Sequence, residues 1–389
     1  MTADSSVPKA SARLCPAVVD ELDSPQSIAA RVSVELESFL ADKAAEFEAI
    51  SPDATAIGQS LIEFTRGGKR IRPVLAWWGF QLAGGTVDTD AELTTGLARA
   101  AGSLELLHAA ALIHDDVIDN SDTRRGRPSL HRQFEARHDR YGLSGDGAAF
   151  GVSSSIVVGD ICLALSEELF ERAEETLGRT TLARRLRATV RRDVMVGQYL
   201  DVLAEVIALD DVRIAERAWE VLSFKSAKYS VEQPLLLGAA LAGADEDLLD
   251  EISEFGLPLG QAFQLRDDVL GITGDPQATG KPAGDDISEG KRTVLIAETA
   301  ARISPDQLDV LAARLGDPGL SSVEVAECVD MITASGGLAA VESFIADKHA
   351  QAHSRIDAWA NGGSERIRIG GPAEDRLKEF ATALSYRTS

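Results

Sequence analysis

Hydrophobic residues recur at intervals of three and four along most of this chain. Leu36, Phe39 and Leu40, followed by Phe47, show the pattern in the first long stretch. This spacing places apolar side chains on one face of an α-helix. The same period predicts further helices over 53–66, 71–83, 90–120, 153–177, 181–208, 211–242, 246–271, 291–302, 306–315, 321–335, 337–360 and 373–386.

Segments rich in turn residues separate the predicted helices. They include GGTVDTD, YGLSGDGAAFG, GDPQATGKPAGDD and NGGSERIRIGGP. Ser24 followed by Pro25 is typical of a helix start, and residues 1–24 carry no sustained period. With neither a fixed repeat nor a long alternating strand pattern, the sequence predicts an all-α protein. We expect a mobile N-terminal tail over 1–24 and one large helical bundle over 25–389, with sites built from inward-pointing side chains.

Composition narrows the class of protein. The 389 residues are 44% hydrophobic and 26% charged, which is enough to bury a sizeable core. The formal net charge is −23, and such a field repels both nucleic acid and anionic lipid. We therefore expect no nucleic-acid partner. An acidic protein can still bind an anionic substrate when metal ions lie between them.

The spacing of the cysteines and the length of the apolar stretches bear on the cellular compartment of the protein. Cys15, Cys162 and Cys328 lie far apart and show neither a disulfide framework nor a zinc-binding spacing. The first residues lack the pattern of a signal peptide. The longest apolar stretches, such as 234–244, are too short to span a bilayer. These features predict a cytoplasmic protein without stable membrane insertion.

Aspartates cluster at the ends of two apolar helical stretches. Asp115 and Asp119 are four residues apart, so they lie about 40° apart on one helix face, with Asp116 flanking them. Asp267 and Asp268 end the second stretch. One such pair alone is more often a solvated helix end. Two clusters facing each other would bind several divalent ions, because buried carboxylates need a cation and oxygen ligands suit Mg²⁺.

Basic residues follow or precede both clusters. They are Lys69, Arg72, Arg124, Arg125, Lys225, Lys281 and Lys291. His108 lies seven residues before Asp115, on the same helix face two turns earlier. Each of these residues alone is more often a helix cap, a solvated surface group or a satisfied core histidine. Together, in a chain this acidic, they favour a diphosphate substrate held between metal ions and Arg or Lys.

At this point the motifs resemble those of a known family, the trans-isoprenyl diphosphate synthases. The matching blocks, within residues 57–300, are GGKRIRP, LIHDDVIDNSDTRRG, GQYLD, FKS and FQLRDDVLGITGDPQATGKPAGDDISEGKRT. The resemblance implies the isoprenoid synthase fold, a helical bundle around a central cavity, and a homodimer. It also implies condensation of isopentenyl diphosphate with dimethylallyl, geranyl or farnesyl diphosphate, assisted by about three Mg²⁺ ions.

The resemblance implies roles for the matching residues. The metal ligands would be Asp115, Asp116, Asp119, Asp267 and Asp268. The allylic diphosphate would be held by Arg124, Lys225, Ser226, Gln264, Lys281 and Lys291, and isopentenyl diphosphate by Lys69, Arg72, His108 and Arg125. Gln198 and Asp201 would support them. Asp115, Asp119, Arg124, Lys225 and Asp267 would carry catalysis by stabilising the departing pyrophosphate, which can itself accept the proton.

The chain departs from the family pattern in two places. Gly271 stands where the second cluster has its third aspartate, which puts the third ion in question. Ser226 stands where threonine is commoner but keeps the hydroxyl.

Four residues that precede the first acid cluster on the same predicted helix bear on the length of the product. Ala110 and Ala111 precede Asp115 by five and four positions, where aromatic residues stop chain growth in the family. Leu107 and Leu104 lie deeper and would form a lower floor. The alanines predict an open pocket and geranylgeranyl diphosphate as product, although they would serve close helix packing equally well. A farnesyl or longer-chain product is the alternative.

Two other functions share parts of the pattern. A class I terpene synthase needs metal-triggered ionisation but no isopentenyl site. The four residues implied for that site together argue against it: Lys69, Arg72, His108 and Arg125. A non-catalytic subunit would have lost several ligands, whereas this chain lacks a single secondary aspartate.

Overall fold

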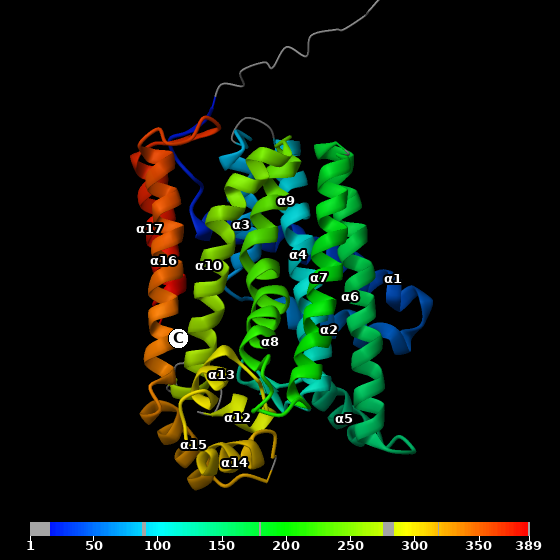
Figure 1. Ribbon diagram of the computed structural model, residues 1–389. Helices are drawn as coiled ribbons and strands as arrows, with labels where there is room; N and C mark the ends of the chain where they lie inside the picture. Colours follow the sequence, from blue (N-terminus) through cyan, green and yellow to red (C-terminus); the bar gives the residue numbers. More distant parts are fainter. Residues whose placement is uncertain (1–15, 88–90, 179, 275–283, 318, 388–389) are drawn as a thin grey trace, which may run out of the picture.

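The protein is a bundle of long helices that stand side by side (Figure 1). The computed structural model describes residues 16–87, 91–178, 180–274, 284–317 and 319–387. The longest helices are α1 (Pro25–Ile50), α4 (Ala91–Ile118), α6 (Gly147–Leu177), α7 (Thr181–Glu205), α10 (Glu246–Thr273) and α16 (Gly337–Ala360). The prediction of an all-α isoprenoid synthase fold is confirmed.

Shorter helices connect the long ones and close one end of the bundle. They are η1 (Pro52–Ala54), α2 (Thr55–Thr65), α3 (Ile71–Leu82), α5 (Leu130–Tyr141), α8 (Ile214–Val221), the π-helix η2 (Leu222–Glu232), α9 (Gln233–Leu241), α12 (Asp285–Glu289), α13 (Val294–Ala300), α14 (Pro305–Arg314), α15 (Ser322–Ala334) and α17 (Gly371–Ser385). In Figure 1, α12 to α15 gather below the long helices. Of these, α5 was not predicted, because it is mostly polar and its buried Leu130, Phe134 and His138 make only a short apolar face.

A short parallel pair of strands ties part of the expected N-terminal tail to the bundle. Strand β1 (Ala17–Val19) pairs with β4 (Ile367–Ile369), near the other end of the chain. Next to it, the indole N–H of Trp77 donates to Asp23 Oδ2 at 2.7 Å and that of Trp78 to the Asp23 carbonyl at 2.9 Å. The prediction of a mobile segment over 1–24 is therefore wrong for residues 16–24. Three-residue strands held by distant partners leave no periodic signal in the sequence.

Helix α4 is the central helix of the bundle and is buried on nearly every side. It packs most extensively against α6 and also contacts α1 and α3. Small residues such as Ala98, Ala101 and Gly102 lie among its buried positions and allow this close approach. Because the helix is surrounded, the aspartates at its end project into the interior of the bundle.

One helix among the described residues, α6, is long and apolar enough to cross a membrane, and a third of its most apolar window is buried. A second span results only if the bent pair α15 and α16 is counted as one. In this structure α6 packs against α4 and α5 as part of the bundle. The expectation that every apolar stretch is too short to span a bilayer therefore does not hold for α6.

Candidate active site

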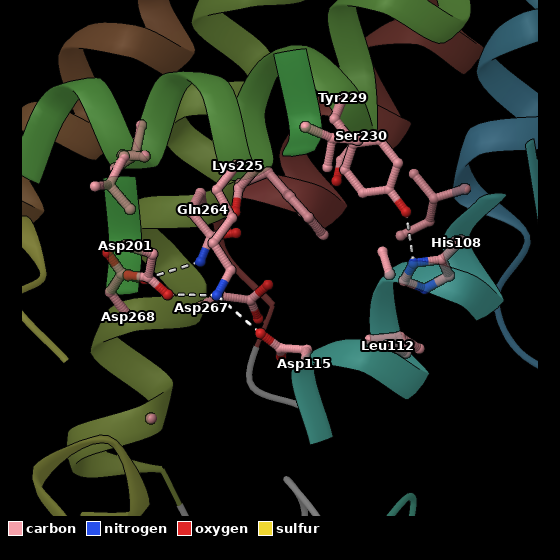
Figure 2. Close-up of a pocket in the computed structure, with 18 of the residues that line it drawn as sticks. His108, Leu112, Asp115, Asp201, Lys225, Tyr229, Ser230, Gln264, Asp267 and Asp268 are labelled. Carbon is pink, nitrogen blue, oxygen red and sulfur yellow. Dashed lines mark hydrogen bonds and ion pairs between the residues drawn. The ribbon is translucent and has the colours of Figure 1, made fainter. Parts of the chain in front are cut away.

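Both acid clusters face one cavity of about 670 Å³ near the ends of α4 and α10. Figure 2 shows Asp115 and Asp267 projecting from these two helices toward the same space. Helix geometry explains the α4 side, because His108, Ala111, Leu112 and Asp115 lie on one face of the helix and all line the cavity. Clusters separated by about 150 residues in the chain thus form one site.

Lysine and glutamine side chains hold Asp115 in place. Its Oδ1 accepts hydrogen bonds from Lys225 Nζ at 3.0 Å and from Gln198 Nε2 at 3.0 Å. Burial alone would raise the pKa of Asp115, but the charges of Lys225 and Lys291 outweigh burial and lower it to about 2. Asp115 is therefore a permanent carboxylate at physiological pH.

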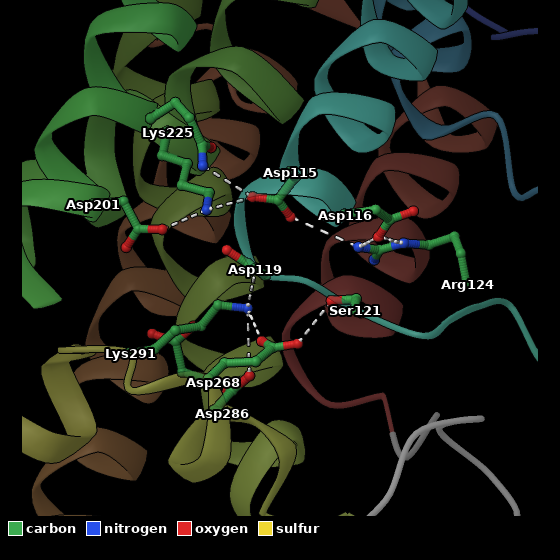
Figure 3. A network of polar contacts seen from close by, with 12 residues as sticks. Asp115, Asp116, Asp119, Ser121, Arg124, Asp201, Lys225, Asp268, Asp286 and Lys291 are labelled. Atoms are coloured by element: carbon green, nitrogen blue, oxygen red, sulfur yellow. Dashed lines mark hydrogen bonds and ion pairs between the residues drawn. The ribbon is translucent and has the colours of Figure 1, made fainter. Parts of the chain in front are cut away.

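Asp119 lies in the opposite electrostatic situation. Its side chain is 3% exposed, and Lys291 Nζ lies 3.4 Å from Oδ2 without donating a hydrogen bond to it. Burial, and then the charge of Asp115, raise the pKa of Asp119 to about 6. The first cluster therefore holds a buried carboxylate whose charge is incompletely balanced (Figure 3).

Asp116 is turned away from the cavity and holds Arg124. The Arg124 Nε donates to Asp116 Oδ1 at 2.8 Å, and Nη2 contacts the same oxygen. Arg124 ends the strand β2 (Thr123–Arg124), which pairs with β3 (Arg127–Pro128). The turn between them needs the left-handed region at Arg125, with φ of 54°. Asp116 thus does not face the cavity itself but holds Arg124 in place at the cavity.

The π-helix η2 brings Lys225 to the first cluster. Besides Asp115, Lys225 Nζ contacts Asp201, which is buried on α7. Burial lowers the pKa of Lys225, but the two aspartates outweigh it and raise the pKa above its usual value. π-helical turns are frequent at functional sites. Ser226, the next residue, also lines the cavity.

The second cluster is held by different partners. Gln264 Nε2 donates to Asp268 Oδ1 at 2.9 Å. Burial is the main cause that raises the pKa of Asp268 to about 8, and the charges of Asp286 and Asp267 add to it. Asp267 forms an ion pair with Arg387, which follows α17. Arg387 was not predicted from the sequence, because it lies 120 residues from its partner.

Asp286 fills the space left by Gly271, the glycine that stands where the family pattern has a third aspartate. A Cβ added at Gly271 would overlap the Asp286 carboxylate, so the two positions compete for one volume. The buried Lys291 Nζ lies 3.8 Å from Asp286 Oδ1 and also contacts Glu289. Asp286, from α12, therefore brings a carboxylate to the place where the family pattern has its third aspartate. Sequence reasoning missed it, although it lies in the quoted segment GDDISEGK.

A second group of cations lines another part of the cavity. Arg72 Nη2 donates to Ser230 Oγ at 2.7 Å, and its guanidinium lies 4.3 Å from the centre of the Tyr229 ring. Tyr229 in turn hydrogen-bonds to His108 Nδ1 at 2.8 Å. Lys69 and Arg125 line the cavity as well. Tyr229 and Ser230 were missed because aromatic and hydroxyl residues on a helix of mixed polarity carry no distinctive spacing.

Replacing His108 with glutamine should flatten the acid side of the protein's stability profile. Burial, followed by the charges of Arg72 and Arg125, lowers the pKa of His108 well below 6.5. Unfolded His108 binds a proton below about pH 6.5, so the free energy of unfolding falls by up to about 1.4 kcal/mol per pH unit as pH drops. Urea unfolding between about pH 5 and pH 7.5 measures this, and equal slopes in both proteins would contradict it.

The expected chain-length residues do not all reach the cavity. Ala111 lines it, but Ala110, Leu107 and Leu104 are fully buried in the hydrophobic core. Ala110 is five residues from Asp115, which rotates it about 140° away from the cavity face. Ala111 lines the cavity in this structure, and the part of Ala110, Leu107 and Leu104 in setting chain length stays a prediction. Leu112, which was not predicted, lines the cavity beside Ala111.

The carboxylates fit a hard divalent cation better than a transition metal. Their donor set is all oxygen, and the buried Oδ2 of Asp119 accepts no hydrogen bond from the described residues, so it is available to a metal ion. Among the described residues no three His, Cys, Asp or Glu side chains already surround a single metal position. Mg²⁺ does not require such a cage, because it keeps waters and binds substrate phosphates. Lys281 lies outside the described residues.

Comparisons with known proteins agree with the site. The polyprenyl synthetase family model matches residues 55–332. The geranylgeranyl diphosphate synthase of Sulfolobus acidocaldarius is 30% identical over 273 residues, covering 69% of this chain and 74% of the relative. The geranylfarnesyl diphosphate synthase of Aeropyrum pernix is 29% identical, covering 80% of this chain and 91% of the relative.

A solved structure is similar over almost the whole chain. It is the geranylgeranyl pyrophosphate synthase of Corynebacterium glutamicum, complexed with isoprenyl diphosphate and magnesium. It aligns with a TM-score of 0.82 and 36% identity, covering 93% of this chain and 98% of that one. The fold and the site define a prenyl-transferring enzyme that acts on diphosphate esters. The chain belongs to the polyprenyl synthetase family, and it is a trans-isoprenyl diphosphate synthase.

Proposed function

We propose that this enzyme condenses isopentenyl diphosphate with dimethylallyl, geranyl and farnesyl diphosphates to give geranylgeranyl diphosphate. The observation that carries the proposal is the single cavity into which Asp115 and Asp267 project, lined by two separate groups of cations. Two diphosphate substrates need two such groups. The small side chain of Ala111 on the cavity wall leaves room for a growing chain.

Magnesium fits the acid clusters. Asp115 and Asp119 would hold ions on one side of the cavity, and Asp267 with Asp286 would hold one on the other. When bound, Mg²⁺ supplies positive charge that stabilises the leaving diphosphate. Asp116 and Asp268 would act indirectly, because Asp116 holds Arg124 and Asp268 accepts a hydrogen bond from Gln264.

Cationic side chains of the protein would bind the two diphosphate groups together with the metal ions. Lys225, Arg124 and Lys291 would bind the allylic diphosphate, with Ser226 and Gln264 beside them. When the allylic carbon–oxygen bond breaks, its electron pair goes to the pyrophosphate, whose added charge these preorganised groups stabilise. Arg72, Arg125, Lys69 and His108 would hold isopentenyl diphosphate. Its double bond supplies the electron pair of the new carbon–carbon bond, and a proton then passes to a pyrophosphate oxygen.

Incorporation of labelled isopentenyl diphosphate tests this function. The purified protein would be given each allylic diphosphate with Mg²⁺ or with excess EDTA, and products would be separated by chain length. We expect Mg²⁺-dependent incorporation and accumulation of the twenty-carbon product. No incorporation in the presence of Mg²⁺ would favour a non-catalytic subunit, whereas consumption of allylic diphosphate alone would favour a terpene synthase.

A twenty-five-carbon product is the second candidate. The geranylfarnesyl diphosphate synthase of A. pernix covers more of this chain than the other synthases compared above by sequence. The chain-length assay separates the two products directly. A shorter, farnesyl product would contradict both.

Replacing Asp286 with asparagine should raise the Mg²⁺ concentration needed for half-maximal turnover by roughly tenfold, the usual effect of losing one metal-supporting group. The Gly271→Asp variant should bring no gain, because the new side chain displaces the Asp286 carboxylate. Gly271→Asp combined with Asp286→Asn should recover much of the loss. Mg²⁺ titrations of turnover measure all three variants, and an unchanged Mg²⁺ requirement in Asp286→Asn would remove Asp286 from the second cluster.

We also propose that the enzyme is a cytoplasmic homodimer paired through α6 and α7. These two helices lie together at one edge of the bundle (Figure 1). They expose large apolar side chains that a monomer rarely leaves in water: Ile156, Val157, Met195, Val196 and Tyr199. The buried free thiols of Cys162 and Cys328 suit a reducing compartment. Sedimentation velocity checks the oligomeric state, and a monomer at micromolar concentration would contradict it.

A further inference from the structure

The segment after α17 reaches into the active-site cavity. Arg387 lines the cavity and forms an ion pair with Asp267. Its guanidinium lies over the ring of Phe263, 4.3 Å from the ring centre. The side chain is 17% exposed, and its buried Nε has no hydrogen-bond partner among the described residues. Arg387 is therefore part of the site, although it comes from a different region of the chain.

Several contacts fix the position of Arg387. Arg266, next to Asp267 on α10, donates from Nε to the Ser385 carbonyl at 2.9 Å. The same Arg266 is held by Glu342 through two hydrogen bonds of 2.8 and 2.7 Å. The imidazole of His349 lies 3.2 Å from Ser385 Oγ and packs edge-on against the ring of Tyr386. The contact between Arg387 and Asp267 thus rests on an anchored backbone.

The electrostatics of the second cluster explain what this arginine does. Asp267, Asp268 and Asp286 bring three acidic groups close enough that their charges act on one another. Lys291 lies near Asp286, but Asp267 has Arg387 as its ion-pair partner among the described residues. A guanidinium and a metal ion on one carboxylate repel each other and compete for its negative charge. Arg387 therefore opposes the binding of any further cation to Asp267.

We propose that Arg387 is the resident counter-ion of Asp267 and that it sets the metal affinity of the second acid cluster by competing for that carboxylate. Without metal, Arg387 balances the charge of Asp267. As metal binds, the guanidinium leaves the carboxylate and stays in the cavity, because Ser385 and Tyr386 keep its backbone in place. The inference rests on the proposed function only in taking Asp267 as a metal ligand. Arg387 is thus a positioning residue of the metal site rather than a metal ligand.

Metal binding to the full-length protein tests the competition without measuring turnover. Isothermal titration with Mn²⁺ in the presence of inorganic pyrophosphate would be run on the wild-type protein and on Arg387→Gln. Removing the competitor should tighten Mn²⁺ binding by about two- to fivefold, the value of an ion pair of this exposure. Arg387→Lys should fall between the two proteins, because it keeps the charge but loses the planar fork.

Two further variants make the result specific. Arg376→Gln removes a positive charge from α17, the helix that precedes Arg387. The Arg376 side chain lies 4.0 Å from Glu21 and does not pair with Asp267, so this variant should leave Mn²⁺ binding unchanged. In an Asp267→Asn background, Arg387→Gln should have no further effect on Mn²⁺ binding, as expected for a pairwise competition. Thermal melting of each variant shows that the fold is kept.

The outcomes separate this inference from the proposed function. A wild-type protein that binds no Mn²⁺ with pyrophosphate would overturn the proposed function itself. Wild-type binding with unchanged or weaker affinity in Arg387→Gln would overturn only the competition by Arg387. If Arg387→Gln bound Mn²⁺ more tightly and did so also in the Asp267→Asn background, Arg387 would act on another group. That result would also overturn the inference.

Discussion

Replacing Asp115 with alanine should lower turnover by roughly a thousandfold, comparable to the loss of a principal electrostatic group in an active site. Lys225 and Gln198 converge on this carboxylate, which faces the cavity, and we propose that it binds the cation that balances the leaving group. The fold should survive, because Lys225 keeps Asp201 as a partner and no buried cation is left alone. Steady-state turnover and thermal melting measure the two effects separately.

A matched control for this variant is available on the surface. Asp309→Ala removes an exposed aspartate of α14, outside the proposed dimer surface, and it should change neither turnover nor melting temperature. Normal turnover by Asp115→Ala would show that the first cluster does not hold the catalytic metal. A large fall in melting temperature would show instead that Asp115 serves packing.

Replacing Ala111 with phenylalanine should shift the main product to a shorter chain. Ala111 lies on the cavity wall beside Leu112, so the added ring would take up space that the growing chain needs. Products separated by chain length measure the shift. Turnover with the shortest allylic substrate should be largely kept, because the diphosphate-binding groups are unchanged.

The neighbouring alanine provides the control. Ala110 packs in the core beside residues of α1 and α6, so Ala110→Phe should chiefly destabilise the protein, by about 1–3 kcal/mol for an overpacked core. If Ala110→Phe shortened the product and Ala111→Phe did not, the growing chain would have to pass on the other side of α4. The two variants therefore map the path of the chain along one helix.

The sequence by itself determined the helical fold and most of the chemistry. Local spacing is enough to find a helix face, and the four-residue interval between Asp115 and Asp119 survives in any fold that keeps the helix. The second cluster and the cations Lys225 and Lys291 were likewise visible as residue types beside apolar stretches. Helix α5 and strand β1 were missed, because a mostly polar helix and a three-residue strand lack a strong period.

Only the tertiary structure decided which charged groups meet. Arg387 pairs with Asp267, and Tyr229 meets His108, in each case across elements that are distant in the chain. Asp286, from the following short helix α12, occupies the space beside Gly271. It also decided which alanine faces the cavity, since the cavity wall is formed by several helices at once. Local periodicity reports the faces of one helix, whereas the partner of each face depends on how the whole bundle packs.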